Sequence, residues 1–425
     1  MSQPSARDGL PLELLTIGNE LLLGFTTDTN AAEIGRILSA AGVRVVRHVS
    51  VGDNAEDIRS AVREALGRTG AVLATGGLGP TRDDVTKHAV AEVFDAPLEF
   101  DPAVWTALVA RFVRMGRTPP ESNRAQAEVP RGGVVLPNRW GTAPGLWLEG
   151  PPGLAILLPG VPGEMRRLLE HEVVPRLAAR AGGRVVRSRL VRTTGIAESA
   201  LAERMGEIEV EIAPLTLAYL PGPDGVDLRL SAWQLLPQDA DHRLDDAAVL
   251  LQERAGEHVY GKDDSDLAAV VLQASRARGL TLATAESCTG GLVGGRLTAI
   301  PGSSEVYLGG VVCYADELKT LLLGVEPGLL ADHGAVSEPV ARAMAQGALQ
   351  RLGAGAAVSV TGIAGPGGGS EAKPVGTVWV GVAAGGRVEA RHAVLSGDRQ
   401  EIRARAAQMA LYLLLRRLRQ TSLSS

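Results

Sequence analysis

The segment from Ala285 to Gly291 contains the residues best suited to covalent chemistry in this 425-residue chain. It reads Ala-Glu-Ser-Cys-Thr-Gly-Gly and ends an apolar run, which predicts a strand that turns into a helix. Such a junction places one side chain at a sheet edge, beside N–H groups that can hold a phosphate or an oxyanion. Ser287 is the candidate nucleophile; the alternative is that Ser287 or Thr289 only caps the helix.

Lys319 is the candidate base for this nucleophile. Only four of the 43 lysines and arginines are lysines, and an ammonium can lose its proton whereas a guanidinium effectively cannot. A strand that ends at Tyr314 and a helix that begins near Asp316 would place Tyr314 and Lys319 at the edge where Ser287 emerges. The alternatives are that Lys319 is a solvated surface lysine, and that Cys288 rather than Ser287 is the nucleophile.

A second candidate site lies between Thr75 and Asp84, after the apolar run Ala71–Ala74. Open α/β sheets bind ligands at this end of a strand, and glycines let backbone N–H groups approach a phosphate closely. Asp83 and Asp84 are candidates to hold a divalent cation, with Glu20 as a third. The alternative is a glycine turn whose acidic residues favour a helix N-terminus. The candidate phosphate-binding residues are Gly76, Gly77, Gly79 and Thr81.

Strands and helices alternate at both ends of the chain. A length of 425 residues exceeds one ordinary core, and the alternation predicts two α/β domains with mainly parallel sheets, at residues 1–175 and 261–425. The pattern of residues 176–260 predicts a small α+β connector. This segment contains no cluster of a nucleophile, a base and a metal ligand. A glycine-rich loop from Thr361 to Gly369 follows the predicted strand Ala356–Val360 and suits a nucleotide phosphate or ribose, or is an uncommitted turn.

Composition narrows the function classes. A net charge of -5 with 45% hydrophobic and 21% charged residues is typical of a soluble globular protein. This composition gives no sign of the strongly basic patch that nucleic-acid binding would need. The lack of a long apolar stretch and of a secretory signal pattern predicts a cytoplasmic protein with no membrane partner. Cys288 and Cys313 are too few for a disulfide framework and have no metal-type spacing.

Five motifs in the first domain resemble the amino-terminal domain of the CinA (competence/damage-inducible) family, which is similar to the molybdopterin-binding MoaB/MogA fold. They are Gly18–Gly24, Asp28–Asn30, Thr75–Asp84, Gly141–Gly145 and Leu158–Met165. The resemblance implies hydrolysis of ADP-ribose to AMP and ribose 5-phosphate with a divalent metal near Asp83 and Asp84, and a KH-like connector. Which of Asp83, Asp84 and Glu20 binds the metal stays open.

Five motifs in the last domain resemble the carboxyl-terminal domain of the same family, equivalent to the stand-alone PncC nicotinamide mononucleotide deamidases. They are Ala285–Gly291, Gly309–Lys319, Gly334–Ser337, Thr361–Pro366 and Lys373–Thr377. The resemblance implies a serine amidohydrolase without a cofactor, in which Ser287 attacks, Lys319 is the base and Tyr314 assists. The family often has asparagine where this chain has Asp316. The implied substrate contacts are Cys288, Thr289, Gly290, Gly291, Thr361, Gly362, Gly365 and Arg399.

We therefore expect a bifunctional hydrolase of pyridine-nucleotide recycling that acts on nicotinamide mononucleotide and ADP-ribose. The resemblance also implies a homodimer. One rival hypothesis is that the first domain is a regulatory module that binds a pterin or a nucleotide without turnover. A second rival, a DNA-uptake partner suggested by the family's name, fits poorly with the acidic charge balance.

Overall fold

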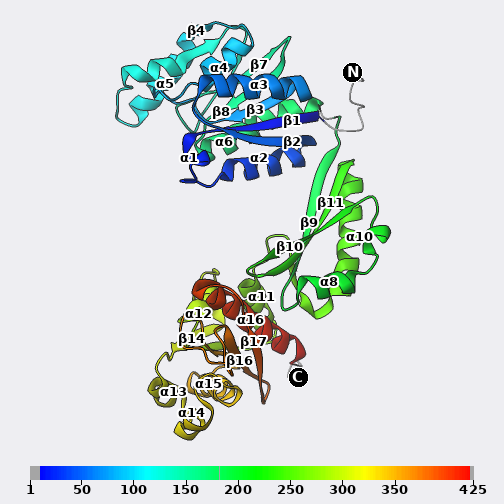
Figure 1. Ribbon diagram of the computed structural model, residues 1–425, viewed down its shortest axis with the longest axis vertical. Coiled ribbons are helices and arrows are strands. Elements are labelled where there is room, and N and C mark those ends of the chain that lie inside the picture. Colours follow the sequence, from blue (N-terminus) through cyan, green and yellow to red (C-terminus); the bar gives the residue numbers. More distant parts are fainter. Residues whose placement is uncertain (1–9, 181, 422–425) are drawn as a thin grey trace. The chain divides into compact units, whose positions relative to one another are not determined.

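The computed structural model describes residues 10–180 and 182–421 (Figure 1). The chain divides into two compact units: residues up to Arg187 with Ser231–Arg243, and Ser188–Leu230 with the chain from Leu244 onward. Predictions that concern residues 1–9, such as the lack of a signal pattern, lie outside the described part. No helix among the described residues is both long and apolar enough to span a bilayer.

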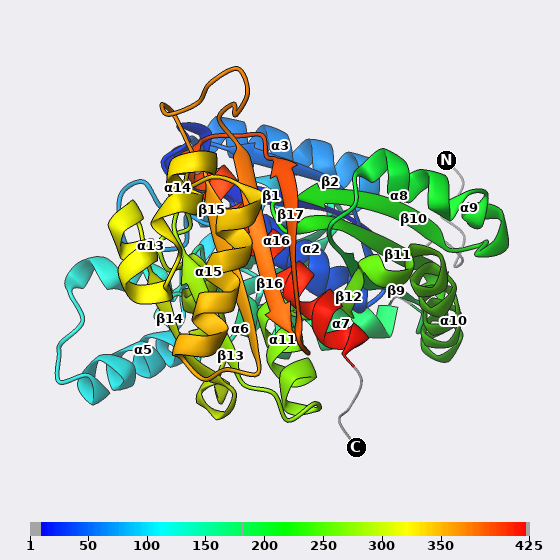
Figure 2. The same cartoon turned by 90° about the horizontal axis from the view of Figure 1, so that it is seen from below.

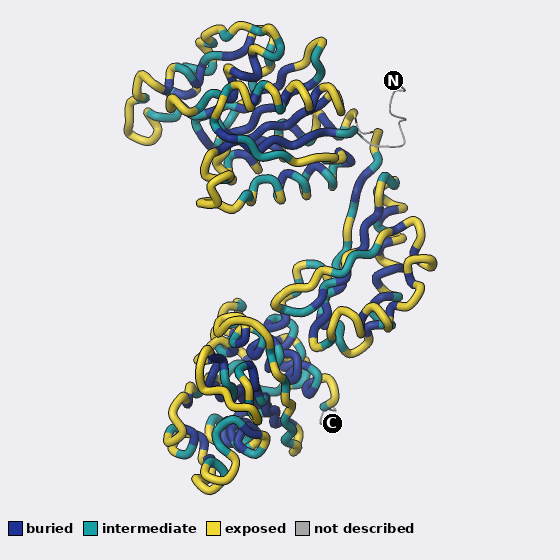
Figure 3. The backbone as a smooth tube through the Cα atoms, in the orientation of Figure 1, coloured by how far each residue is buried: buried dark blue, intermediate teal, exposed yellow. Residues whose placement is uncertain are grey.

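The first domain is built on a six-stranded sheet of order β2-β1-β3-β8-β7-β6. Neighbours among β2, β1, β3 and β8 are parallel, whereas β7 and β6 continue the sheet antiparallel. The strands are β1 (Leu10–Ile17), β2 (Val43–Val51), β3 (Ala71–Thr75), β6 (Val134–Leu136), β7 (Gly145–Gly150) and β8 (Gly153–Leu158). The inner strands are nearly continuous apolar runs because helices cover both faces of the sheet (Figure 3).

Two helical layers cover this sheet. One face packs against α2 (Thr29–Ala40), α6 (Pro162–Leu168), the π-helical turn η2 (Leu169–Val173) and α7 (Val174–Arg180); the other packs against α3 (Ala55–Thr69) and α4 (Thr86–Val93). The remaining elements of the domain are α1 (Asn19–Leu22), β4 (Leu98–Phe100), α5 (Pro102–Arg114), the 3₁₀ helix η1 (Glu121–Ala127) and β5 (Glu128–Pro130). The carboxyl ends of β1, β3 and β8 therefore stay open between the two layers.

The connector has a four-stranded sheet of order β10-β11-β9-β12. Its elements are β9 (Val185–Thr193), α8 (Glu198–Met205), α9 (Ile208–Glu211), β10 (Thr216–Gly222), β11 (Gly225–Leu235), α10 (Pro237–Ala255), η3 (Gly256–His258) and β12 (Val259–Lys262). The division between the two compact units falls within β9, β11 and α10. The predicted α+β connector is confirmed.

The last domain is built on a five-stranded sheet of order β14-β13-β15-β16-β17. Its strands are β13 (Leu282–Glu286), β14 (Tyr307–Val312), β15 (Ala356–Gly362), β16 (Thr377–Ala384) and β17 (Arg387–Val394). The first three are parallel, and β16 and β17 form an antiparallel hairpin across Gly385-Gly386. The predicted α/β fold class is confirmed, although only the first half of the sheet is parallel.

Helices cover both faces of this sheet as well (Figure 2). One core contains α11 (Leu267–Arg276), α12 (Leu292–Thr298) and α16 (Arg399–Gln420), and the other contains α13 (Asp316–Leu323), α14 (Pro327–His333) and α15 (Glu338–Arg351). A short 3₁₀ helix, η4 (Ser303–Glu305), precedes β14. Because β14, β13 and β15 run parallel, their carboxyl ends meet at one edge, where Glu286 pairs with Val312 and Val360.

Candidate active site

Ser287 is the first residue after β13 and lies between the ends of the two neighbouring strands. Its N–H donates to the carbonyl of Val360 on β15 at 2.9 Å, and the Glu286 carbonyl accepts from the N–H of Cys313 at 2.9 Å. Ser287 is buried, and its hydroxyl makes no hydrogen bond to any residue that the structure describes. The backbone is thus fixed on both sides while Oγ remains available to a ligand.

Glu286 holds the turn that follows, a role that the sequence analysis missed. Its buried carboxylate accepts the N–H groups of Gly291, Val293 and Gly294 at 3.0, 3.1 and 2.8 Å. The carboxylate thereby caps the start of α12 and complements the helix dipole. An acidic residue just before a Gly-Gly pair at a predicted helix start was the available signal. The idea that Ser287 or Thr289 only caps the helix is wrong, since Glu286 supplies this cap.

The oxyanion donors expected at Cys288 to Gly290 are fewer than predicted. The N–H of Gly290 donates to the carbonyl of Ser287 at 3.1 Å. In the described chain, the N–H groups of Cys288 and Thr289 donate to no oxygen, but both act on the Cys288 thiol and lower its pKa, so an oxyanion would compete with this thiol for them. Arg403 of α16 fixes the same turn by donating to the carbonyls of Cys288 at 3.1 Å and Thr289 at 2.8 Å.

Lys319 lies on α13 and is only 1% exposed, so the alternative of a solvated surface lysine is wrong. Its Nζ lies 2.9 Å from Oδ1 of Asp316 and 3.4 Å from the carbonyl of Tyr314. The charge of Lys319 also acts on the Cys313 thiol, which places the lysine beside the strand next to Ser287. No hydrogen bond joins Nζ to the Ser287 hydroxyl in the part of the chain that the structure describes, so the expected Ser–Lys pair is not hydrogen-bonded.

The other predicted substrate contacts line the same edge from three elements. Arg399 donates to the Tyr314 hydroxyl at 3.0 Å and to the Gly365 carbonyl at 2.6 Å, and so joins the end of β14 to the glycine-rich loop. The Thr361 hydroxyl donates to the carbonyl of Ala335 at 2.9 Å. Tyr314 is 60% exposed, whereas Thr361 is buried. Tyr314 and the exposed Arg399 are therefore the members of this set that solvent reaches.

Cys288 points away from this edge. Its thiol is buried in the core, where a Cβ added to Gly362 would lie 3.1 Å from Sγ. Burial raises the pKa of the Cys288 thiol to about 11, and it raises the pKa of the Cys313 thiol as well. Since the thiolate is the nucleophilic form, the structure disfavours Cys288 as the nucleophile.

This burial predicts that alkylation of thiols leaves the last domain active. Iodoacetamide at pH 7.5 is expected to change its turnover by less than about twofold, because both thiols are protonated and shielded. Peptide mass spectrometry would verify that Cys288 and Cys313 stay unmodified, with urea-unfolded protein as the positive control for alkylation. Loss of activity in step with modification of Cys288 would restore the thiol as the nucleophile.

The first domain has a cavity of about 400 Å³ at the carboxyl ends of its parallel strands. The predicted residues that line it are Glu20, Gly76, Gly77, Gly79, Asp83 and Asp84. Thr81 is not part of the wall; instead, its N–H donates to Oδ2 of Asp84 at 2.8 Å and its hydroxyl donates to the same oxygen. The Gly79 N–H donates to Oδ1 of Asp84 at 2.8 Å. Asp84 therefore organises the glycine loop.

Two further carboxylates, Asp53 and Glu164, line this cavity and were missed. Each follows a predicted strand, after Gly52 and in the loop Pro159–Met165, which was the available signal. Among the described residues, no three His, Cys, Asp or Glu side chains form a ready metal-ligand group. Carboxylates beside a phosphate-binding loop nevertheless suit Mg²⁺, which commonly binds one or two carboxylates together with substrate phosphates.

Comparison with known proteins gives the family. Residues 264–418 match the family described as "CinA C-terminal domain". Residues 13–179 match the family described as "Probable molybdopterin binding domain". Residues 188–261 match the family described as "Damage-inducible protein CinA KH domain". A CinA-like protein of Gemmatimonas aurantiaca is 55% identical over 406 residues, which are 95% of each chain. A CinA-like protein of Salinibacter ruber is 47% identical over 389 residues, 91% of this chain and 94% of that one.

Solved structures are also similar to part of the chain. The crystal structure of competence/damage inducible protein CihA from Agrobacterium tumefaciens is 46% identical and covers 36% of this chain and 94% of that chain, with a TM-score of 0.35. The sequence relatives match this chain over nearly their whole length. All three family matches lie within this one chain. The chain therefore belongs to the CinA family.

Proposed function

We propose that the last domain hydrolyses the amide of nicotinamide mononucleotide to nicotinate mononucleotide and ammonia. The observation that carries this proposal is the free Ser287 hydroxyl at the common edge of three parallel strands, with the buried Lys319 beside the adjoining strand. Arg399 is exposed beside the glycine-rich loop, where its guanidinium is available to the ribose phosphate of such a substrate. Membership of the family supports the same assignment.

In the proposed reaction, Oγ of Ser287 attacks the amide carbon while its proton passes to the neutral amine of Lys319. The N–H groups of Cys288 and Thr289 stabilise the oxyanion. Lys319 then gives the proton to the departing nitrogen, and ammonia leaves. Water attacks the resulting ester, which releases nicotinate mononucleotide and restores Ser287.

The proton transfer requires Nζ of Lys319 to move from Asp316 toward Oγ when the substrate binds. Catalytic hydrogen bonds often tighten only in the substrate complex. The direct test is to incubate the purified protein with nicotinamide mononucleotide and to measure ammonia. A folded protein that releases none would leave the last domain with a binding or regulatory role.

We also propose that the first domain hydrolyses ADP-ribose to AMP and ribose 5-phosphate. Of the predicted phosphate-binding residues, Gly77 keeps an N–H without an acceptor in the described chain, whereas the N–H groups of Gly76, Gly79 and Thr81 are engaged. Asp83 with Glu20 is available to a divalent cation on the same cavity wall. When bound, such a cation would neutralise charge on the phosphates. Asp84 keeps the loop in shape through its hydrogen bonds to Gly79 and Thr81.

Asp84→Ala is expected to lower AMP release from ADP-ribose by about 100-fold or more, because the glycine loop loses the acceptor that fixes it. A chelator is expected to abolish the same activity in the unaltered protein. Deamidation by the last domain should persist in both experiments, which provides an internal control for folding. The measurement is AMP by chromatography with added Mg²⁺.

The alternative for the first domain is binding without turnover. It is favoured by the hydrogen bonds that engage Asp84 and by the lack of a ready three-ligand group in the described chain. Binding of ADP-ribose with no AMP released under any divalent metal would support this regulatory role and remove the pyrophosphatase.

A further inference from the structure

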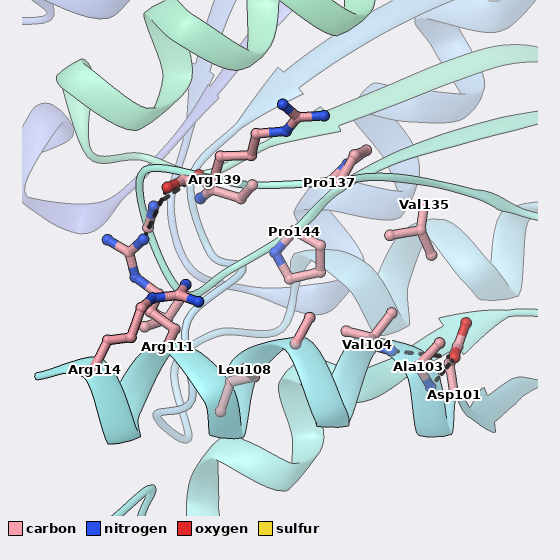
Figure 4. A pocket seen from close by; sticks show the side chains of 14 residues that line it. Asp101, Ala103, Val104, Leu108, Arg111, Arg114, Val135, Pro137, Arg139 and Pro144 are labelled. Carbon is pink, nitrogen blue, oxygen red and sulfur yellow. Dashed lines mark hydrogen bonds between the residues drawn. The ribbon is translucent and has the colours of Figure 1, made fainter. Parts of the chain in front are cut away.

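The first domain has a second cavity, of about 620 Å³, between α5 and the chain from Val135 to Pro144 (Figure 4). Its middle is apolar: Val104 and Leu108 of α5 face Val135 and Pro144 across the gap. This volume is in the range of small-molecule sites, and such walls suit the faces of a planar ring. None of these residues has a role in either proposed site.

One end of the cavity is cationic. Arg111 and Arg114 lie in the last turn of α5, and Figure 4 shows both at the same end of the pocket. Arg111 donates to the carbonyls of Arg139 and Trp140 at 3.0 and 2.5 Å, so its guanidinium is fixed without a carboxylate partner. Its Nε is buried and has no hydrogen-bond partner. Arg114 is exposed, and its side chain pairs with no residue in the described ranges.

Asp101 is the acidic residue in the wall, and it lies at the opposite end. Its carboxylate caps α5 by accepting the N–H groups of Ala103 and Val104 at 2.8 and 3.2 Å. It is therefore committed to the helix and far along α5 from the arginines. The cavity thus offers a ring-sized apolar middle and an anion site at one end, in a chain whose net charge is -5.

The cavity adjoins the candidate phosphate site. Thr142 lines both cavities, and Gly141 packs directly against Glu164, a residue of the phosphate site. Asn138 fixes the segment between the two cavities. Its side-chain N–H donates to the Glu164 carboxylate, and its side-chain oxygen accepts from the N–H of Gly141. The two cavities are therefore neighbours that share Thr142 in their walls.

We propose that this cavity receives the nucleoside arm of the substrate and that the arginine end selects a nucleoside that carries an additional phosphate on its ribose. The preferred substrate class is then ADP-ribose 2′-phosphate and related phosphorylated ADP-ribose. This inference rests on the proposed pyrophosphatase. The planar base lies between α5 and Pro144, and the phosphomonoester binds Arg111 and Arg114, a residue type that suits such an anion. An unphosphorylated ribose leaves both guanidinium groups without an anion.

The test compares two ligands by calorimetry with the full-length protein at constant ionic strength: ADP-ribose and ADP-ribose 2′-phosphate, each with Ca²⁺ in place of Mg²⁺ to slow turnover. The phosphorylated ligand is expected to bind at least about tenfold more tightly. In Arg114→Gln the ratio should fall to within about twofold of unity, with little change for ADP-ribose. The matched control is Arg117→Gln, an exposed arginine three residues further along that does not line the cavity.

Equal affinities in the unaltered protein, or a ratio that Arg114→Gln and Arg117→Gln change alike, would overturn the proposal. Turnover in Mg²⁺ separates it from the proposed function. If ADP-ribose is hydrolysed but the extra phosphate gives no advantage, the arginine site fails and the pyrophosphatase stands. If neither ligand is hydrolysed but the preference and its loss in Arg114→Gln persist, the site stands and the pyrophosphatase fails.

Discussion

Ser287→Ala is expected to reduce deamidation of nicotinamide mononucleotide by about 1,000-fold or more and to leave the fold unchanged. Removal of a nucleophile that forms a covalent intermediate has effects of this size or larger, because no neighbouring group can replace it. The neighbouring thiol of Cys288 is buried and protonated. The Ser287 hydroxyl makes no hydrogen bond within the described chain, so its loss leaves no polar partner unsatisfied.

The measurement is the initial rate of ammonia release, with circular dichroism and the melting temperature as checks of folding. Ser303→Ala is a matched control, because Ser303 belongs to η4, which precedes β14 and thus lies at the opposite edge of the same sheet. The control should keep the full rate. A Ser287→Ala protein that retains more than about a tenth of the rate would exclude covalent catalysis by this residue.

Separate measurements of kcat and of the dissociation constant make this experiment more specific. Ser287→Ala should lower kcat while the dissociation constant of nicotinamide mononucleotide changes little, since the hydroxyl acts in the transition state. Loss of binding without a change in kcat would instead indicate a substrate contact.

Much of the sheet edge that carries each candidate site could be predicted from the sequence, because the sequence patterns that indicate it are local. The runs that became β1, β3, β13 and β15 are apolar on both faces, which is typical of parallel strands between two helical layers. The carboxyl ends of parallel strands meet at one edge, so the residues that follow β13, β14 and β15 had to be neighbours. The glycine loops after β3 and β15 were recognisable for the same reason.

The residues that could not be predicted depend on contacts distant in sequence. Glu286 precedes the Gly290-Gly291 pair by four residues, which is a weak signal in the sequence, and its role as the cap of α12 depends on the turn that the fold makes between them. Asp53 and Glu164 meet at one cavity from different strands. The helices α5 and α15 were not predicted either: the small residues and glycine of Glu338–Arg351 give a weak apolar stripe, and packing on β13, β15 and β16 completes that helix.

For Lys319, the structure shows burial and a carboxylate partner that could not be predicted from the sequence. Its side chain is almost fully buried, and among the described residues one carboxylate, that of Asp316, lies within hydrogen-bond distance of Nζ. The family resemblance left the effect of Asp316 unresolved, and the structure shows that this residue is a partner of the proposed base. Half-exposed Asp316 thus pairs with the buried Nζ from the solvent side.

Lys319→Met is expected to lower the kcat of deamidation by about 1,000-fold or more, because methionine fills the buried space but cannot accept the proton of Ser287. Lys319→Arg should be equally inactive, since a guanidinium keeps its charge yet does not act as a base. Asp316→Asn is the matched control: it keeps an acceptor oxygen near Nζ, and its rate is expected to stay within about tenfold. If Lys319→Met binds nicotinamide mononucleotide normally and still releases ammonia at a tenth of the original rate, Lys319 is structural and another group must take the proton.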